Sequence, residues 1–156
     1  MGELSHVNRA GQVQMVDVAG KAITTREATV EGWLQLHPCH VEAIHSLPKG
    51  DALMVAQVAG IQAGKRCSEL IPLCHPVGLS KLDVSVELEG DRIRILASAK
   101  TEAQTGVEME AYTAVAIAGV TLIDMLKGVD PDLTLEGIRL ISKTGGKAPW
   151  VRESES

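Results

Sequence analysis

The stretch KLDVSVELEGDRIRILASA, residues 81–99, is typical of a β-hairpin. Apolar residues alternate with other residues from Lys81 to Leu88, and the alternation resumes from Arg92 to Ala99. The intervening Glu89-Gly90-Asp91 has the composition of a tight turn. Since alternation with period two indicates a strand with one buried face, the sequence predicts two antiparallel strands at 81–88 and 92–99.

A long apolar run follows the hairpin and is typical of a helix. Thr105-Gly-Val-Glu108 fits a capping box at its start, and Gly128 with Asp130-Pro131 supplies a stop signal. Its most apolar part, AYTAVAIAGVTLI at 111–123, has 13 residues, whereas a membrane-spanning helix needs roughly 20. We therefore expect a buried core helix and no membrane partner.

Three further segments flank this hairpin and helix. AITTREATVEGWLQL at 22–36 has a period-two pattern and predicts a first strand. Pro38 to Leu47 and the Ala- and Leu-rich stretch after Asp51 predict two helices, and Thr134 to Ser142 predicts a last strand.

The resulting order is β-α-β-β-α-β, the α+β arrangement called ferredoxin-like or split βαβ. We expect an antiparallel sheet with helices packed on one face, in one domain over residues 1–156 whose ends, 1–12 and 144–156, are mobile. One face of such a sheet stays uncovered, so we also expect a homo-oligomer formed by sheet or helix packing.

Composition excludes several classes of protein. A formal net charge of -5 and only 2% aromatic residues argue against a nucleic-acid or membrane-surface binder. The cysteines, Cys39, Cys67 and Cys74, are odd in number and lack C-x-x-C spacing, so neither a disulfide framework nor a zinc ribbon is indicated. Reduced thiols fit a cytoplasmic location.

Charged residues lie at both ends of the predicted core helix. Asp124 and Lys127 share a helix face, either as a simple ion pair or as an acid and base at one site. Glu108 and Glu110 either stabilise the helix start or contribute to a site. Fourteen residues separate Glu110 from Asp124, about 21 Å along a helix. If both carboxylates serve one site, two subunits must build it.

Other candidates lie in loops. Cys74 and His75 precede Pro76, but their spacing to other ligands favours no zinc site, and Cys74 is either a nucleophile or a buried thiol. Gly60-x-x-x-Gly64-Lys65-Arg66 departs from a phosphate loop in its spacing and its last residue. A phosphate site and ordinary surface charge both remain open for the cations Arg26, Lys49, Lys65, Arg66, Lys143 and Lys147.

Four longer strings are more specific than any of these spacings. GKRCSELIPLCHP at 64–76, TGVEMEA at 105–111, DMLK at 124–127 and KTGGK at 143–147 resemble the cyclic pyranopterin monophosphate synthase family of molybdenum cofactor biosynthesis. With SHVN at 5–8 and MVDV at 15–18, the resemblance covers nearly the whole chain. Cys67 departs from the family pattern, in which we expect Thr or a similar residue.

The resemblance implies a lyase that converts 3',8-cyclo-7,8-dihydro-GTP to cyclic pyranopterin monophosphate with release of pyrophosphate. It implies that Asp124 and Lys127 are the central acid and base. It also implies a hexamer, built as a trimer of dimers with sites between subunits, and no redox cofactor; we assign no metal, and magnesium stays unassigned. The substrate site that it implies contains Leu73, Cys74, His75, Glu108, Met109 and Glu110, with Arg26, Lys49, Lys65, Lys143 and Lys147 placed for the triphosphate or for proton transfer.

The main alternative is a non-catalytic ferredoxin-like module that senses a nucleotide, since this fold hosts many functions. Such a module binds its ligand without consuming it and does not need the Asp124–Lys127 pair.

Overall fold

The structure is a computed structural model that describes residues 7, 8 and 10–153. It confirms the α+β fold, with an antiparallel sheet in the strand order β2-β3-β1-β4-β5. The elements are β1 (Thr24–Gln35), α1 (Pro38–Ala43), α2 (Ala52–Lys65), α3 (Cys67–Leu70), β2 (Leu79–Glu89), β3 (Arg92–Ala103), α4 (Glu108–Leu126), β4 (Thr134–Thr144) and β5 (Trp150–Val151).

The predicted strands form, and the helices differ in detail. The hairpin pairs Leu88 with Ile93 and Val84 with Ala97, as its alternation requires. The first helix is shorter than predicted, and the second divides at Arg66 into α2 and α3. The sequence did not predict β5, which lies within the end expected to be mobile and pairs with β4. Residues 1–6 and 9 of the other end lie outside the described part.

The capping box predicted at the start of α4 is wrong. Val107 occupies the N-cap position without a side-chain cap, and Glu108 is the first helical residue instead of the fourth residue of a box begun by Thr105. The Glu108 carboxylate lies over Gly106, where a Cβ would collide with it, and it accepts a hydrogen bond from Lys143 Nζ at 3.2 Å. Lys143 of β4 therefore binds the Glu108 carboxylate, which the capping-box motif predicts to be hydrogen-bonded to a backbone N–H.

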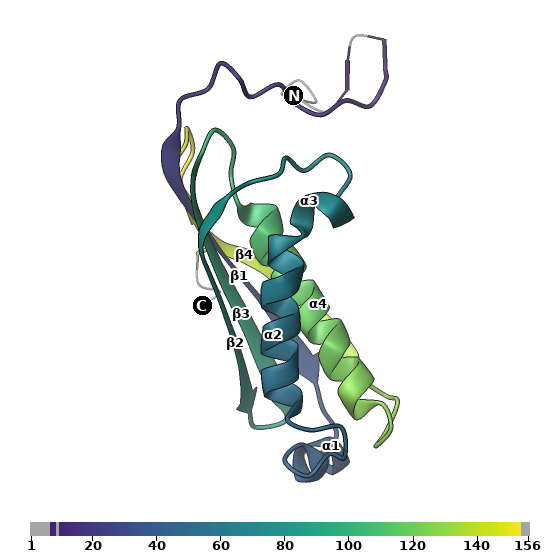
Figure 1. Cartoon of the computed structure of the whole chain (residues 1–156). Helices are drawn as coiled ribbons and strands as arrows, with labels where there is room; N and C mark the ends of the chain where they lie inside the picture. The colour runs from purple at the N-terminus through teal and green to yellow at the C-terminus, as the bar shows by residue number, and fades with distance from the viewer. Residues whose placement is uncertain (1–6, 9, 154–156) are drawn as a thin grey trace.

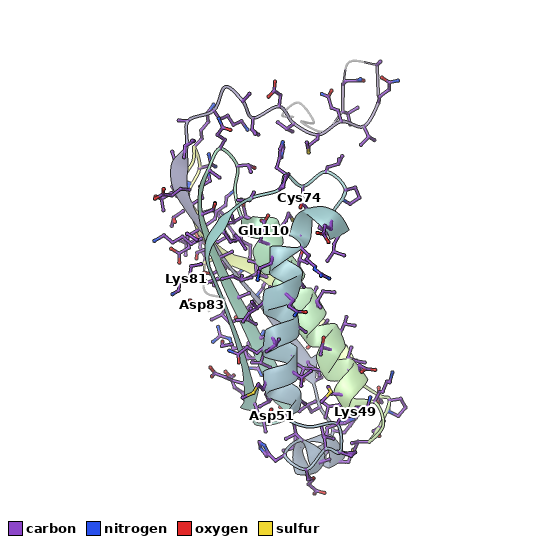
Figure 2. The ribbon with its side chains drawn as sticks, viewed as in Figure 1. Lys49, Asp51, Cys74, Lys81, Asp83 and Glu110 are labelled. Carbon is purple, nitrogen blue, oxygen red and sulfur yellow. The ribbon has the colours of Figure 1, made fainter. Side chains whose placement is uncertain are left out.

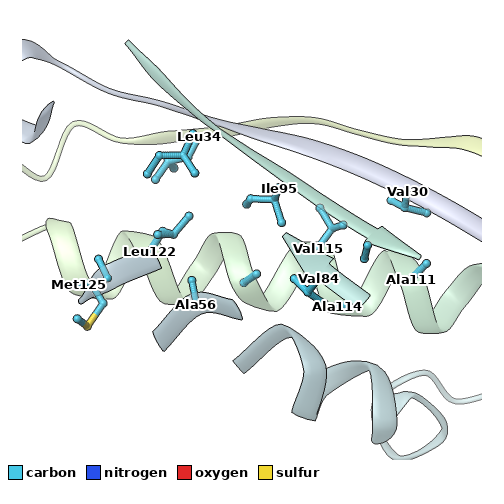
Figure 3. Packing of buried hydrophobic residues seen from close by; sticks show 14 of the residues in the cluster. Val30, Leu34, Ala56, Val84, Ile95, Ala111, Ala114, Val115, Leu122 and Met125 are labelled. Atoms are coloured by element: carbon cyan, nitrogen blue, oxygen red, sulfur yellow. The ribbon is translucent and has the colours of Figure 1, made fainter. Parts of the chain in front are cut away.

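Helices α2 and α4 lie side by side on one face of the sheet (Figure 1). Their facing side chains are small, and the strands supply aliphatic residues such as Val30, Leu34 and Ile95, all fully buried (Figure 3). By length and hydropathy alone α4 could cross a membrane, but more than half of it is buried inside this fold. The expectation of a buried core helix is confirmed.

Glycines allow α2 to approach α4 closely. A Cβ on Gly60 would lie 2.9 Å from the carbonyl oxygen of Ala114, and a Cβ on Gly64 would lie 3.1 Å from that of Glu110. Both distances are shorter than ordinary van der Waals contact, so a side chain at either position would push the helices apart. The Gly60-x-x-x-Gly64 spacing is therefore a helix-packing feature and not a remnant of a phosphate loop.

The outer face of the sheet carries charged residues. Glu31, only 5% exposed, accepts hydrogen bonds from Arg94 and Arg139, each at 2.9 Å. The Arg92 guanidinium lies 3.8 Å above the Trp33 ring, a cation–π contact. This face is compatible with solvent, so it does not by itself require a partner. Exposed apolar side chains lie on α2 and α4, and Trp150 and Val151 of the edge strand β5 are exposed as well; those of the two helices are Met54, Val55, Val58, Ile117 and Val120.

Gly60→Ala should destabilise the protein although alanine is the better helix former. We expect a loss of about 1–2 kcal/mol in the free energy of unfolding, because the collision with the Ala114 carbonyl outweighs the gain in propensity. Urea denaturation measures it. Gly128→Ala is the matched control, because a Cβ there meets nothing within 4 Å. Equal stability of the two variants would contradict close helix packing.

Glu31→Gln should remove a pH-dependent part of the stability. Burial alone would raise the pKa of Glu31, but hydrogen bonds and charge from Arg94 and Arg139 hold it below its ordinary value of 4.5. Its contribution is therefore present above pH 4.5 and is lost as pH falls through the lowered pKa of the folded state.

We expect Glu31→Gln to cost about 2 kcal/mol near neutral pH, with a smaller difference from wild type in acid. Urea denaturation at several pH values measures both differences, with the exposed Glu102→Gln as control. A cost that does not change with pH would show that Glu31 acts through its shape alone.

Candidate functional site

Two neighbouring cavities lie beside the N-terminal end of α4. The first, which we name the basic cavity, has a volume of about 590 Å³, and the second, the thiol cavity, about 450 Å³. Lys21, Gly106 and Glu108 line both of them. The basic cavity adds Arg26, Lys143 and Lys147, and the thiol cavity adds Leu73, Cys74, His75 and Met109. The structure thus brings most of the predicted site residues together.

The basic cavity has an excess of positive charge in an acidic chain, because four cations line it against the two carboxylates of Glu27 and Glu108. Arg26 is held in place because its Nε donates to the Ala103 carbonyl at 3.1 Å, and the Gly145-Gly146 turn lies against Arg26. Both glycines have positive φ, 78° and 69°, a backbone conformation that L side chains rarely adopt. This turn places Lys147 on the wall of the cavity. The four cations Lys21, Arg26, Lys143 and Lys147 suit a phosphate-bearing ligand.

The loop that carries Cys74 and His75 forms one wall of the thiol cavity. His75 donates from Nε2 to the Val16 carbonyl at 2.6 Å, and this bond holds the N-terminal segment beside the cavity. Val16 and Val18 line the cavity with apolar side chains. A flat, partly apolar ligand group is therefore better suited to this cavity than a phosphate.

Glu110 lies behind the thiol cavity as a buried carboxylate, only 3% exposed. Its Oε1 accepts a weak hydrogen bond from Cys74 Sγ at 3.7 Å, and within the described part of the chain its Oε2 has no hydrogen-bond partner. Burial raises the pKa of Glu110 above its usual range.

The thiols of Cys67, which is buried, and Cys74, which is half-buried, are protonated at neutral pH. Burial raises the pKa of Cys74 to about 12, and the neighbouring Glu110 carboxylate contributes to this shift. Burial also raises the pKa of Cys67, whose sulfur atom lies 3.7 Å from the sulfur atom of Cys74. Since the thiolate is the reactive form, this environment does not activate Cys74 as a nucleophile.

The predicted acid and base lie at the opposite end of α4. Lys127 Nζ is 2.7 Å from Asp124 Oδ1, and Lys49 Nζ is 3.6 Å from Asp124 Oδ2. Lys49 also donates to the Asp124 main-chain carbonyl at 3.0 Å. The hydrogen bond and charge of Lys127, followed by the charge of Lys49, lower the pKa of Asp124. This end forms an exposed Lys-Asp-Lys cluster.

One chain does not unite the two groups of residues. Figure 2 shows Cys74 and Glu110 near one end of the helical layer and Lys49 near the other. Because α4 is uninterrupted, Glu110 and Asp124 are about 21 Å apart along its axis. Lys65, at the end of α2, is exposed and lines neither cavity.

Sequence reasoning missed Lys21, which lines both cavities. Its place is set by Gln104, whose side-chain amide donates to the main-chain carbonyls of Ala19 and Lys21 at 3.2 and 3.0 Å. This contact joins residues more than 80 positions apart, and no spacing in the sequence signals it.

One group of residues could hold a metal ion. In the part of the chain that the structure describes, ligand atoms of Cys67, Cys74 and Glu110 lie within 4.8 Å of one another.

Comparison with known proteins gives a consistent result. The model of the MoaC family matches residues 15–146. The chain is similar to the cyclic pyranopterin monophosphate synthase of Corynebacterium efficiens, at 49% identity over 95% of this chain and 97% of the relative. It is also similar to the synthase of the same name from Chloroflexus aggregans, at 48% identity over 99% of this chain and 96% of the relative. With matches of this extent, the chain belongs to the MoaC family of enzymes.

Proposed function

We propose that this enzyme converts 3',8-cyclo-7,8-dihydro-GTP to cyclic pyranopterin monophosphate and releases pyrophosphate, an early step of molybdenum cofactor biosynthesis. The observation that carries the proposal is the basic cavity, which adjoins a less charged cavity through Lys21, Gly106 and Glu108. Such a pair of cavities suits a ligand with a polyphosphate at one end and a ring system at the other. Relatives that share nearly the full length of the chain carry the corresponding name.

The triphosphate occupies the basic cavity in this proposal. Arg26, Lys143 and Lys147 neutralise its charge, and they stabilise the pyrophosphate as it leaves. Lys143 must exchange its present partner, the Glu108 carboxylate, for a phosphate oxygen. Magnesium that accompanies the substrate would be held mainly by the phosphates, so we assign no protein ligand to it. The reaction needs no redox cofactor.

The purine-derived ring occupies the thiol cavity, beside Leu73, Cys74, His75 and Met109. Rearrangement of that ring requires protons to move between ring atoms and water. Cys74 and Glu110 are both protonated more readily than usual because they are buried. In our proposal the Cys74 thiol positions the ring by donating a hydrogen bond, Glu110 supports Cys74 from behind the cavity, and the proton transfers are left to other residues.

Asp124, Lys127 and Lys49 carry the acid-base chemistry in this proposal. Asp124 remains ionised and fixes the ammonium groups of Lys127 and Lys49 on its two sides. A lysine held beside a carboxylate in a site that a second subunit closes can donate a proton and accept one back. Lys65 stays a proposed triphosphate contact because it lies at the end of α2 nearest the cavities.

The length of α4 makes this a site between subunits. Since about 21 Å separates the two groups within one chain, the Lys-Asp-Lys cluster of one subunit would meet the cavities of another. The exposed apolar side chains of α2 and α4 support a homo-oligomer that packs through its helices. We propose a hexamer built as a trimer of dimers. A cytoplasmic location stays a prediction.

Pyrophosphate release from freshly prepared 3',8-cyclo-7,8-dihydro-GTP tests the activity. Lys127→Ala should lower turnover at least about 100-fold because it removes the proposed acid-base group, while substrate affinity and assembly change little. The matched control is Lys81→Ala, which breaks an equally exposed pair with Asp83 on β2. Substrate that is bound and recovered unchanged from the wild type would favour the nucleotide-sensing module. Full turnover by Lys127→Ala would remove Lys127 from the mechanism.

Mixed oligomers test whether the site lies between subunits. Lys127→Ala and His75→Ala alter opposite ends of the helical layer, and each variant alone should be nearly inactive. In a random mixture of dimers, half would contain one chain of each kind, with one intact and one doubly altered site. Recovery of about one quarter of wild-type activity is expected. No recovery from dimers shown by mass spectrometry to be mixed would place the whole site in one chain.

A further inference from the structure

A compact group of three side chains lies at the back of the thiol cavity: Cys67, Cys74 and Glu110. The proposed acid-base steps do not require these three side chains to lie close together. Cys67 begins α3, Cys74 lies in the loop that follows, and Glu110 projects from the first turn of α4. Their sulfur and carboxylate oxygen atoms all lie within 4.8 Å of one another. Three elements therefore bring two soft donors and one hard donor to a single point.

The distances between these atoms match two edges of a coordination tetrahedron. A Zn–S bond of 2.3 Å at the tetrahedral angle places two sulfur atoms about 3.8 Å apart, and the Cys67 and Cys74 sulfur atoms are 3.7 Å apart. The corresponding sulfur-to-oxygen edge is about 3.6 Å, and Cys74 Sγ lies 3.7 Å from Glu110 Oε1. A disulfide, with an S–S bond of about 2.05 Å, would require the sulfur atoms to move much closer.

The surroundings also favour a cation. Glu110 is 3% exposed and Cys67 is 2% exposed, and Glu110 Oε2 lacks a hydrogen-bond partner among the residues described. A buried carboxylate with one oxygen that lacks a partner is costly, and a cation bound to this carboxylate would offset the cost of burying its charge. The Thr113 hydroxyl lies 3.4 Å from Cys67 Sγ, where it can orient a bound thiolate.

We propose that Cys67, Cys74 and Glu110 form a binding site for Zn²⁺ or a similar thiophilic divalent cation. Two thiolates select such a metal over Mg²⁺, which prefers oxygen ligands alone. Coordination removes the thiol protons. Cys74 lines the thiol cavity, so a water molecule from that cavity can occupy the fourth position. Three protein ligands and one open position are typical of an accessible zinc centre.

Metal binding at these three residues has a consequence for substrate binding, and this consequence rests on the proposed function. A metal ion there would engage Cys74 and Glu110, which the substrate ring also needs, and so metal and substrate should compete. Cys67 takes no part in the proposed reaction, which allows metal binding to be removed while catalysis is retained.

Cobalt titration of the full chain, kept reduced by a phosphine, tests the site directly. Wild type should bind one Co²⁺ per chain and show a thiolate-to-cobalt charge-transfer band, which Zn²⁺ abolishes. Cys67→Ser should lose that band and bind Co²⁺ at least about tenfold more weakly. Cys39→Ser is the matched control, because Cys39 is exposed on α1 and should leave the band intact. A thermal unfolding curve checks that Cys67→Ser is folded.

Two results would overturn the site: no charge-transfer band in the reduced wild type, or an equal band in Cys67→Ser. A second measurement addresses competition, as Zn²⁺ should inhibit pyrophosphate release by the wild type at least about tenfold more strongly than release by Cys67→Ser. Equal inhibition of the two proteins would overturn competition. If the wild type releases no pyrophosphate, the proposed function fails and the cobalt titration still decides the metal site.

Discussion

The uninterrupted helix α4 is the constraint on which the rest of the molecule depends. It packs beside α2 and against the same face of the sheet, and Gly60 and Gly64 allow the two helices to approach until a Cβ would collide with a backbone carbonyl. A helix packed so closely cannot bend or shift to bring its ends together. Every function that needs both Glu110 and Asp124 must therefore obtain one of them from another copy of the chain.

Two buried carboxylates, Glu31 and Glu110, lie in environments that shift their pKa values in opposite directions. Glu31 is held by Arg94 and Arg139, and its pKa is lowered, whereas Glu110 has a weak thiol partner and its pKa is raised by burial. The first arrangement stabilises the charged form and joins the strands β1, β3 and β4. The second leaves a desolvated acid beside a cavity, which costs stability and is common where a protein binds or transforms a ligand.

The sequence predicted those parts of the fold that depend on periodicity. Alternation located the β2–β3 hairpin, and the apolar run located α4, because both patterns reflect burial of one face. The features that it missed depend on contacts between distant segments. Lys143 of β4 donates a hydrogen bond to Glu108, which therefore does not form the expected capping box. Strand β5 forms by pairing with the edge of β4, and no local sequence pattern predicts this pairing. Likewise, alternation places Glu31 on the outer face but does not show that two arginines cover it.

The candidate site follows the same division. The resemblance named most of the residues around the cavities, yet only the structure shows that they form two groups and that Lys21 joins the cavities. The departure at position 67 also gains a physical meaning. With a Thr there, as the resemblance leads us to expect, Cys74 and Glu110 would be one thiol beside one carboxylate, too few ligands for a metal. Cys67 adds a second sulfur at tetrahedral spacing, and a single change of side chain can thus add a ligand site to a pocket whose fold is unchanged.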